Sequence, residues 1–167
     1  RNALEAVQGD DPDKAREALM LALTDHPDRL DLVHTLAVME LQNGSAELAL
    51  DLAEKAAAVA GERKEPSDIA LLPQLLLTQG AAHEELRNPT LALSTYDQVL
   101  EVESDHPLAM QGKGHLLLAW GKVDEGLQVL QEAVDAGKDD QRFLDATKKL
   151  IEGIKKFQSD DLHPRNF

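Results

Sequence analysis

Small residues recur along this chain at a fixed spacing of 34 positions. Ala92 and Gly126 are 34 residues apart, and Gly80 and Gly114 repeat that offset. The same offset separates three further pairs, Val99 and Ala133, Ala15 and Ala49, and Ala22 and Ala56. A period of this length, with turn residues between apolar runs, predicts pairs of helices that stack on one another as repeats.

The composition supports a helical array and limits the classes of partner that the chain is expected to bind. Of the 167 residues 43% are hydrophobic but only 3% are aromatic, so the core must be built from Ala, Leu and Val. Such a core favours closely packed helices, because strands prefer β-branched and aromatic residues. The formal net charge is −14. This charge argues against nucleic acid or an anionic membrane as a partner, since both bind clustered Lys and Arg, and favours a basic or neutral partner.

Caps, prolines and apolar spacing locate the helices. They predict helices over residues 2–8, 12–26, 28–42, 45–61, 67–87, 89–103, 105–121, 122–136 and 139–158. The last of these is amphipathic, with a face rich in Lys and Asp opposite its apolar face, as expected of a helix that caps the end of an array. The polar residues 159–167 are expected to form a flexible tail.

One segment interrupts the period. Ala49 and Ala92 are 43 residues apart, so nine residues have been added to one repeat. The segment E-R-K-E-P-S, residues 62–67, is expected to form a charged surface loop, alone or together with an extended helix on one side. In the helix that follows, Pro73 either introduces a kink or marks the true start.

The pattern resembles the tetratricopeptide repeat (TPR) family over nearly the whole chain. In that family small residues allow the two helices of a repeat to approach closely, and a glycine lies in the turn between them. The small positions of the first helices are Ala37, Gly80 and Gly114, those of the second helices are Ala15, Ala49, Ala92 and Gly126, and the turn glycines are Gly44 and Gly121. The chain departs from the pattern where Gln79 and Lys113 replace apolar residues, where Glu40 and His83 replace aromatic ones, and where Arg87-Asn88 replaces a turn glycine.

The resemblance implies an all-α fold of antiparallel helix pairs, stacked as a right-handed TPR superhelix with a C-terminal capping helix. The predicted TPR domain covers residues 1–158. It consists of a truncated repeat (1–27), three complete repeats (28–61, 68–104 and 105–138) and a capping helix (139–158), followed by the tail (159–167).

Ligands of this family lie in a concave groove that is lined by the first helix of each repeat. The corresponding positions here are Asp31, His34, Val38, Leu41, Gln74, Leu77, Ala81, Glu84, Leu108, Gln111, His115 and Leu118. This lining mixes apolar and neutral polar side chains, which favours a docked peptide or partner helix. The alternative for each residue is burial against a neighbouring helix as ordinary core.

Other binding chemistries find little support in the sequence. A C-terminal carboxylate is gripped by charged donors. The family's carboxylate clamp would fall on His34, Val38, Thr78, Leu108 and Gly112, or, one repeat earlier, on Leu4, Thr35, Gln74 and Thr78. Neither set can bind a chaperone tail. The six histidines lack H-E-x-x-H or i, i+4 spacing, and no phosphate loop or nucleophile motif occurs, so we expect no metal, no cofactor and no catalysis.

We therefore expect a non-catalytic protein-protein interaction or scaffold module. Three alternatives remain open: an accessory domain of a larger enzyme or secretion and assembly protein, a self-associating array, and a small specialised chaperone. The chain has no cysteine and no apolar run of the roughly 20 residues that a membrane span needs. We expect a soluble, cytoplasmic protein. The sequence begins at Arg1 in the middle of a helical pattern, so the true N-terminus can be missing. Export of the protein is therefore not excluded.

Overall fold

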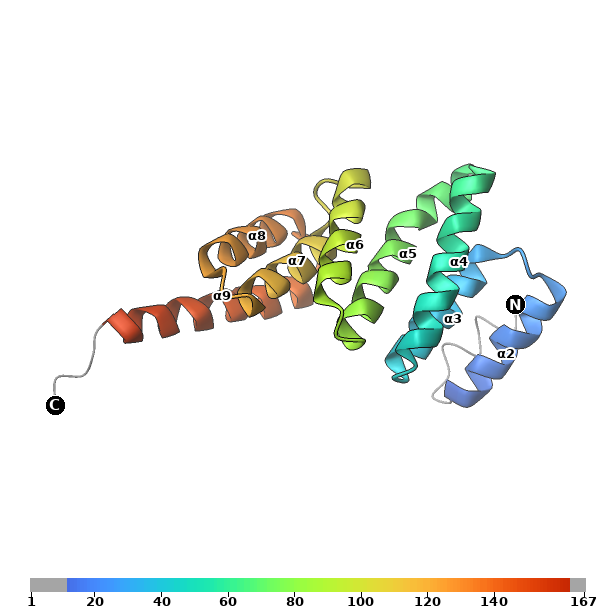
Figure 1. The fold of residues 1–167 in the computed structure, drawn as a ribbon, viewed down its shortest axis with the longest axis horizontal. Helices are drawn as coiled ribbons and strands as arrows, with labels where there is room; N and C mark the ends of the chain where they lie inside the picture. Colours follow the sequence, from blue (N-terminus) through green and yellow to red (C-terminus); the bar gives the residue numbers. More distant parts are fainter. Residues whose placement is uncertain (1–11, 163–167) are drawn as a thin grey trace. The chain divides into compact units, whose positions relative to one another are not determined.

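The fold is described from a computed structural model, which describes residues 12–162. These residues form eight α-helices and no strand: α2 (Pro12–Asp25), α3 (Leu30–Gln42), α4 (Ala46–Arg63), α5 (Pro66–Glu85), α6 (Pro89–Val102), α7 (Pro107–Ala119), α8 (Val123–Ala136) and α9 (Gln141–Leu162) (Figure 1). The expected all-α repeat architecture is confirmed. Residues 1–11, which hold the whole of the predicted first helix, and residues 163–167 of the predicted tail lie outside the described part.

The chain divides into two compact units, Arg1–Gln98 and Val99–Phe167, and the boundary falls within α6. In the first unit α3 contacts both α4 and α5, and α4 contacts α5. In the second unit α7 packs on α8, and α8 packs on α9. The repeat boundaries predicted from the sequence stay a prediction.

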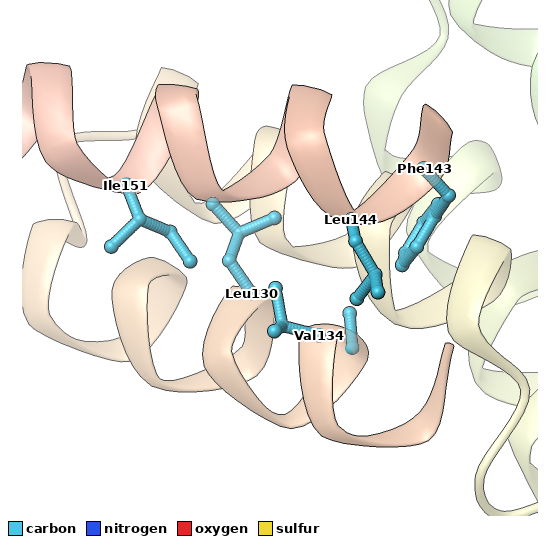
Figure 2. Packing of buried hydrophobic residues seen from close by; sticks show 6 residues of the cluster. Leu130, Val134, Phe143, Leu144 and Ile151 are labelled. Carbon is cyan, nitrogen blue, oxygen red and sulfur yellow. The ribbon is translucent and has the colours of Figure 1, made fainter. Parts of the chain in front are cut away.

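Each unit is held together by apolar contacts between helices. In the first unit Leu19 of α2 packs with Leu32 and Leu36 of α3. In the second unit Leu130 and Val134 of α8 meet α9, whose contribution consists of Phe143, Leu144 and Ile151 (Figure 2). Leu and Val side chains supply most of these contacts, as the low aromatic content predicts.

The small residues of the repeat pattern lie where two helices approach most closely. A β-carbon placed on Gly80 would lie 2.5 Å from Cε1 of Tyr96, so α5 and α6 leave no room for a side chain at this position. Gly114 is similar, because a β-carbon there would lie 2.7 Å from Cγ of Leu130. The recurring glycines are therefore required by close helix packing.

The nine inserted residues lengthen two helices instead of forming a loop. Helix α4 has 18 residues, four more than α2, α6 and α8. Helix α5 has 20 residues, seven more than α3 and α7. The connection between α4 and α5 consists only of Lys64 and Glu65, whereas four residues connect α2 to α3. The two longer helices and the shorter connection together account for the nine inserted residues. Of the loop expected over residues 62–67, only Lys64 and Glu65 lie outside the helices.

Local chemistry explains why this segment is helical. Glu, Arg and Lys are good helix formers, and Pro66 occupies the first turn of α5, where its missing N–H is not needed. Lys64 reverses the chain with a left-handed φ of 55°. Pro73 lies inside α5 and is buried there, so it is neither the start of the helix nor a break in it.

Three turns that join the two helices of a repeat have the same geometry. Gly44, Arg87 and Gly121 all have positive φ, at 81°, 58° and 76°. In each turn the following N–H bonds to a carbonyl five residues earlier: Ser45 to Glu40, Asn88 to His83, and Lys122 to Leu117. This pattern is a Schellman motif, which closes the helix end and usually requires glycine. Arg87 therefore adopts a conformation that its side chain disfavours.

Arg87→Gly is expected to raise the free energy of unfolding by roughly 0.5–1 kcal/mol, because glycine adopts left-handed φ without the penalty of a β-carbon. Urea denaturation followed by circular dichroism measures the change. Arg87→Ala is the control, since it removes the side chain but keeps the β-carbon, and it should not stabilise. Equal stabilisation by both variants would place the strain in the arginine side chain and not in the backbone.

Candidate functional site

The first unit carries eight of the predicted groove residues on two neighbouring helices. Helices α3 and α5 contact each other directly. Spacings of three and four residues place each set on one helix face. The α3 set is Asp31, His34, Val38 and Leu41, and the α5 set is Gln74, Leu77, Ala81 and Glu84. Each of these residues is exposed or half-buried and none belongs to the buried core.

His34 links α3 to α5. Its Nε2 lies 3.2 Å from the Thr78 hydroxyl, and that hydroxyl donates to the backbone carbonyl of Gln74 at 3.0 Å. Because the only hydroxyl proton is used there, Nε2 of His34 must carry the proton and donate to Thr78. Burial lowers the pKa of His34, an effect opposed by its bond to the Gln74 backbone. The ring is therefore neutral at pH 7 and serves as a polar tie between the helices.

Both charged members of this set already have partners. Asp31 accepts bonds from the Arg29 side chain at 2.8 and 2.5 Å, and these bonds lower the pKa of its carboxyl group. Glu84 accepts the hydroxyl proton of the buried Tyr96. Burial first, and then the Glu84 carboxylate, raise the pKa of Tyr96 above its ordinary value. The side chains of this face that are not tied in these ways are mostly apolar, above all Leu77.

The second unit carries the other four predicted residues on α7. Leu108 is 50% exposed, and His115 is also exposed. Gln111 donates through Nε2 to the hydroxyl of Thr147 in α9 at 2.9 Å. Gln111 occupies the same repeat position as His34, counting the offsets of 43 and 34 residues. His34 thus joins α3 to α5, and Gln111 joins α7 to α9 in the same way.

Leu118 takes part in the packing of α7 on α8. A β-carbon on Gly126 would lie 2.8 Å from Cγ of Leu118, and the leucine packs against the apolar cluster between α8 and α9. A substitution of Leu118 therefore tests the stability of the fold before it tests binding.

A cleft recurs at equivalent places in the two units. In the first unit it measures about 340 Å³ and lies at the N-terminal ends of α3 and α5. In the second it measures about 320 Å³ and lies where α7 and α9 begin. Asp31 lines the first cleft and Leu108, its repeat equivalent, lines the second. Three carboxylate residues contribute to each, Asp28, Asp31 and Asp68 in one and Glu103, Asp105 and Asp140 in the other.

The two clefts were not predicted from the sequence. Of their lining residues, sequence comparison between repeats had selected only Asp31 and Leu108. The sequence did contain one indication of the clefts, because acidic residues occur just before or at the start of α3, α5, α7 and α9. On a chain with 31 acidic residues, however, such a pattern does not stand out.

Within residues 12–162, no three His, Asp or Glu side chains come together as a group that could hold a metal ion. None of the helices in that range is both long and apolar enough to cross a membrane.

Comparisons with known proteins support the fold. Residues 77–141 match a family model described as tetratricopeptide repeat. No curated protein sequence matches the chain. A tetratricopeptide repeat protein from Parabacteroides merdae ATCC 43184 has a similar crystal structure, with a TM-score of 0.68, 18% sequence identity, and coverage of 95% of this chain and 59% of that one. The crystal structure of MamA is also similar, with a TM-score of 0.60, 12% identity, and coverage of 91% of both chains. This chain thus spans about three fifths of the length of the first structure.

Proposed function

Because residues 77–141 match a tetratricopeptide repeat model and the chain shares the fold of a tetratricopeptide repeat protein, we propose that it is a non-catalytic protein-interaction module. It binds a peptide or a partner helix along the first helices of its repeats. The observation that carries this proposal is a pair of apolar side chains on predicted groove positions, the half-buried Leu77 of α5 and the exposed Leu108 of α7. Accessible apolar residues on such a surface gain most when a partner removes them from water.

The polar residues of these positions favour a role in holding the surface in shape. His34 and Gln111 each bond to a neighbouring helix, and Asp31 and Glu84 are paired within the chain. The bonds of His34, Gln111 and Glu84 each join two helices. They hold neighbouring helices together and so preorganise the apolar positions, which lowers the entropic cost of binding. Specificity for the partner then rests on its apolar side chains.

The charge around the two clefts indicates the kind of partner. Among the residues that the structure describes, no Lys or Arg lines the cleft of the second unit, where three carboxylate residues surround Pro107, Leu108 and Phe143. A segment with apolar anchors and basic or neutral flanks meets favourable electrostatics there, whereas an acidic segment is repelled. Cytoplasmic location stays a prediction from the sequence.

We expect Leu77→Glu and Leu108→Glu each to weaken partner binding by roughly tenfold or more, because a carboxylate in an apolar contact loses its hydration without gaining a partner. A pull-down from the source lysate, with quantification by mass spectrometry, identifies proteins retained by the wild-type chain. Surface plasmon resonance with the purified partner then measures the affinity of each variant.

Leu91→Glu is the matched control. Leu91 is 52% exposed on α6, the second helix of its repeat, and lies outside the predicted groove. This variant should bind like the wild type, and all three variants should keep their helical circular dichroism. Equal binding by the wild type and both groove variants would move the working surface to another face of the molecule. Loss of helicity in Leu77→Glu would instead assign Leu77 to the core.

A further inference from the structure

Asn43 and Gly44 form an Asn-Gly pair in the turn that joins α3 to α4. Asn43 ends α3 with a φ of −83° and a ψ of 2°, and Gly44 follows with its left-handed φ of 81°. Both residues are exposed, and a β-carbon on Gly44 would meet no atom within 4 Å. The pair therefore lies open to water at the surface of the first unit.

An asparagine followed by glycine has a reactivity of its own. The backbone nitrogen of the following residue attacks the side-chain amide carbon of the asparagine and closes a cyclic imide. Most residues hinder this attack, because a β-carbon crowds the nitrogen and restricts the backbone angles that bring the two atoms together. Glycine lacks both restrictions. Spontaneous loss of the side-chain amide is therefore fastest in an Asn-Gly pair.

The equivalent turns of the other two repeats lack this pair. Leu86 and Trp120 occupy the position of Asn43 and have nearly the same backbone angles, with ψ of 3° and 6°. Neither side chain carries an amide. Asn88, the other asparagine of the described chain, precedes Pro89, whose nitrogen has no hydrogen to lose and cannot become the nucleophile. Within the described residues the reactive pair is thus confined to the α3–α4 turn.

The folded turn slows this reaction without preventing it. The Gly44 N–H donates to the carbonyl of Leu41 at 3.0 Å, and the Ser45 N–H donates to the carbonyl of Glu40 at 2.8 Å. The Gly44 nitrogen becomes reactive only when the first of these bonds opens. Bonds at an exposed helix end open by local fraying, which requires far less free energy than unfolding of the whole domain. The folded chain therefore reaches the reactive conformation without losing its core.

We propose that Asn43 is a site of spontaneous deamidation in the folded protein. Water or hydroxide takes the Gly44 N–H proton, the nitrogen bonds to Cγ of Asn43, and the side-chain amide takes up a proton and leaves as ammonia. Water then opens the imide. Cleavage at Cγ gives aspartate, whereas cleavage at the backbone carbonyl carbon gives isoaspartate, in which the main chain runs through the side chain. The reaction needs only water and is independent of the proposed binding function.

Both products disturb the α3–α4 turn, but to different degrees. Aspartate adds a negative charge at the C-terminal end of α3, where the helix dipole disfavours it. Isoaspartate also inserts a methylene group into the main chain between Asn43 and Gly44. The spacing that places the Ser45 N–H on the Glu40 carbonyl is then lost. Glu40 is the buried partner of Arg16, so the altered turn is adjacent to the contact between α2 and α3.

The test ages the full chain in mildly alkaline buffer and follows the tryptic peptide Leu30–Lys55, which contains no other asparagine, by liquid chromatography and mass spectrometry. Wild-type protein should accumulate two products at Asn43, with isoaspartate in excess. They should form faster at higher pH, because the nitrogen must lose its proton. Asn43→Gln should show complete loss of this modification, since ring closure from the longer side chain is unfavourable. Asn88 in the same sample should stay unmodified.

Low urea concentrations separate local opening from global unfolding. Local opening exposes little surface, so the rate of product formation should stay constant below the unfolding transition. A rate that rises steeply with urea in this range would mean that the reaction needs global unfolding, and would overturn the proposal. The proposal also fails if Asn43 stays unmodified in the folded chain while the urea-unfolded chain is modified.

Asn43→Asp separates the effect of the added charge from that of the altered main chain. Urea denaturation followed by circular dichroism should give the highest midpoint for fresh wild-type protein, a lower one for Asn43→Asp, and the lowest for wild-type protein aged to full conversion. A fully aged protein as stable as Asn43→Asp would refute the predicted loss of the turn's hydrogen bonds.

Discussion

Arg16→Met is expected to lower the free energy of unfolding by about 3 kcal/mol, because it leaves a buried carboxylate without its partner. Arg16 of α2 and Glu40 of α3 form an ion pair in which the Arg16 side chain is 44% exposed and the Glu40 side chain only 3%. Without its partner, the half-exposed Arg16 side chain would be hydrated at little cost in free energy. The Glu40 carboxylate could be hydrated only if α3 moved away from α2. The stability of the contact between the first two described helices depends on this pair.

Chemical denaturation followed by circular dichroism measures the change, and a double variant provides the control. Arg16→Met/Glu40→Leu removes both charges together and should recover most of the lost stability, since a well-packed apolar pair often replaces a buried ion pair without loss. Glu40→Leu alone should lower the free energy of unfolding less than Arg16→Met, because the side chain left without a partner, Arg16, is half-exposed and can be hydrated. If Arg16→Met proved as stable as the wild type, Glu40 would have to be hydrated in the folded protein.

Gly80→Ala is expected to lower the free energy of unfolding by about 2 kcal/mol, although this exchange normally stabilises a helix by roughly 1 kcal/mol. The new β-carbon would lie 2.5 Å from Cε1 and 2.9 Å from Cδ1 of Tyr96. The Tyr96 ring cannot easily yield, since it is 4% exposed and its hydroxyl is held by Glu84. Helices α5 and α6 must therefore separate to admit the methyl group.

Gly153→Ala is the matched control for this prediction. Gly153 also lies inside a helix, but its β-carbon would meet no atom within 4 Å. The substitution should therefore raise stability by roughly 1 kcal/mol, in line with ordinary helix propensity. Opposite signs for the two variants, measured by urea denaturation, would establish close packing as the reason for the repeating glycines. A gain in stability for both would mean that α5 and α6 tolerate a wider separation.

The repeat pattern was sufficient to predict the helices and the places where they approach. Gly80 and Gly114 were identified from their spacing alone, and each proves to face a buried side chain of the next helix. The turn glycines Gly44 and Gly121 likewise have the positive φ that their position demands. These features follow from local chemistry, because only glycine combines a left-handed backbone with the absence of a β-carbon.

The departures from the family pattern could be located in the sequence but not explained there. Glu40 replaces an aromatic residue because Arg16 supplies a charge across the helix interface. Gln79 replaces an apolar residue and donates to the carbonyl of Ala53 at 3.2 Å. Both explanations need residues more than 20 positions away. Pairing of this kind is visible only when the helices are placed in space.

The predicted groove residues show the same limit. Spacing indicated which side of each helix they share, but it gave no account of what each side chain does there. Leu118 proves to pack on Gly126, and Gln111 is engaged by Thr147. The half-buried Leu77 and the exposed Leu108 remain as the candidate apolar anchors. Whether a partner uses them is a prediction that the binding experiments decide.

The lengthened pair of helices α4 and α5 has a consequence for how this chain can evolve. All of the added residues lie at the end of α4 and the start of α5, so the ladder from Gly80 onward keeps its register with Ala92. Material inserted at such a turn displaces no contact elsewhere, because each repeat packs only on its neighbours. The α4–α5 turn can therefore gain residues without shifting the register of the repeats around it. The added residues are not all free to vary, because Ala60 is fully buried with Leu30 of α3 and Leu71 packs against the same cluster.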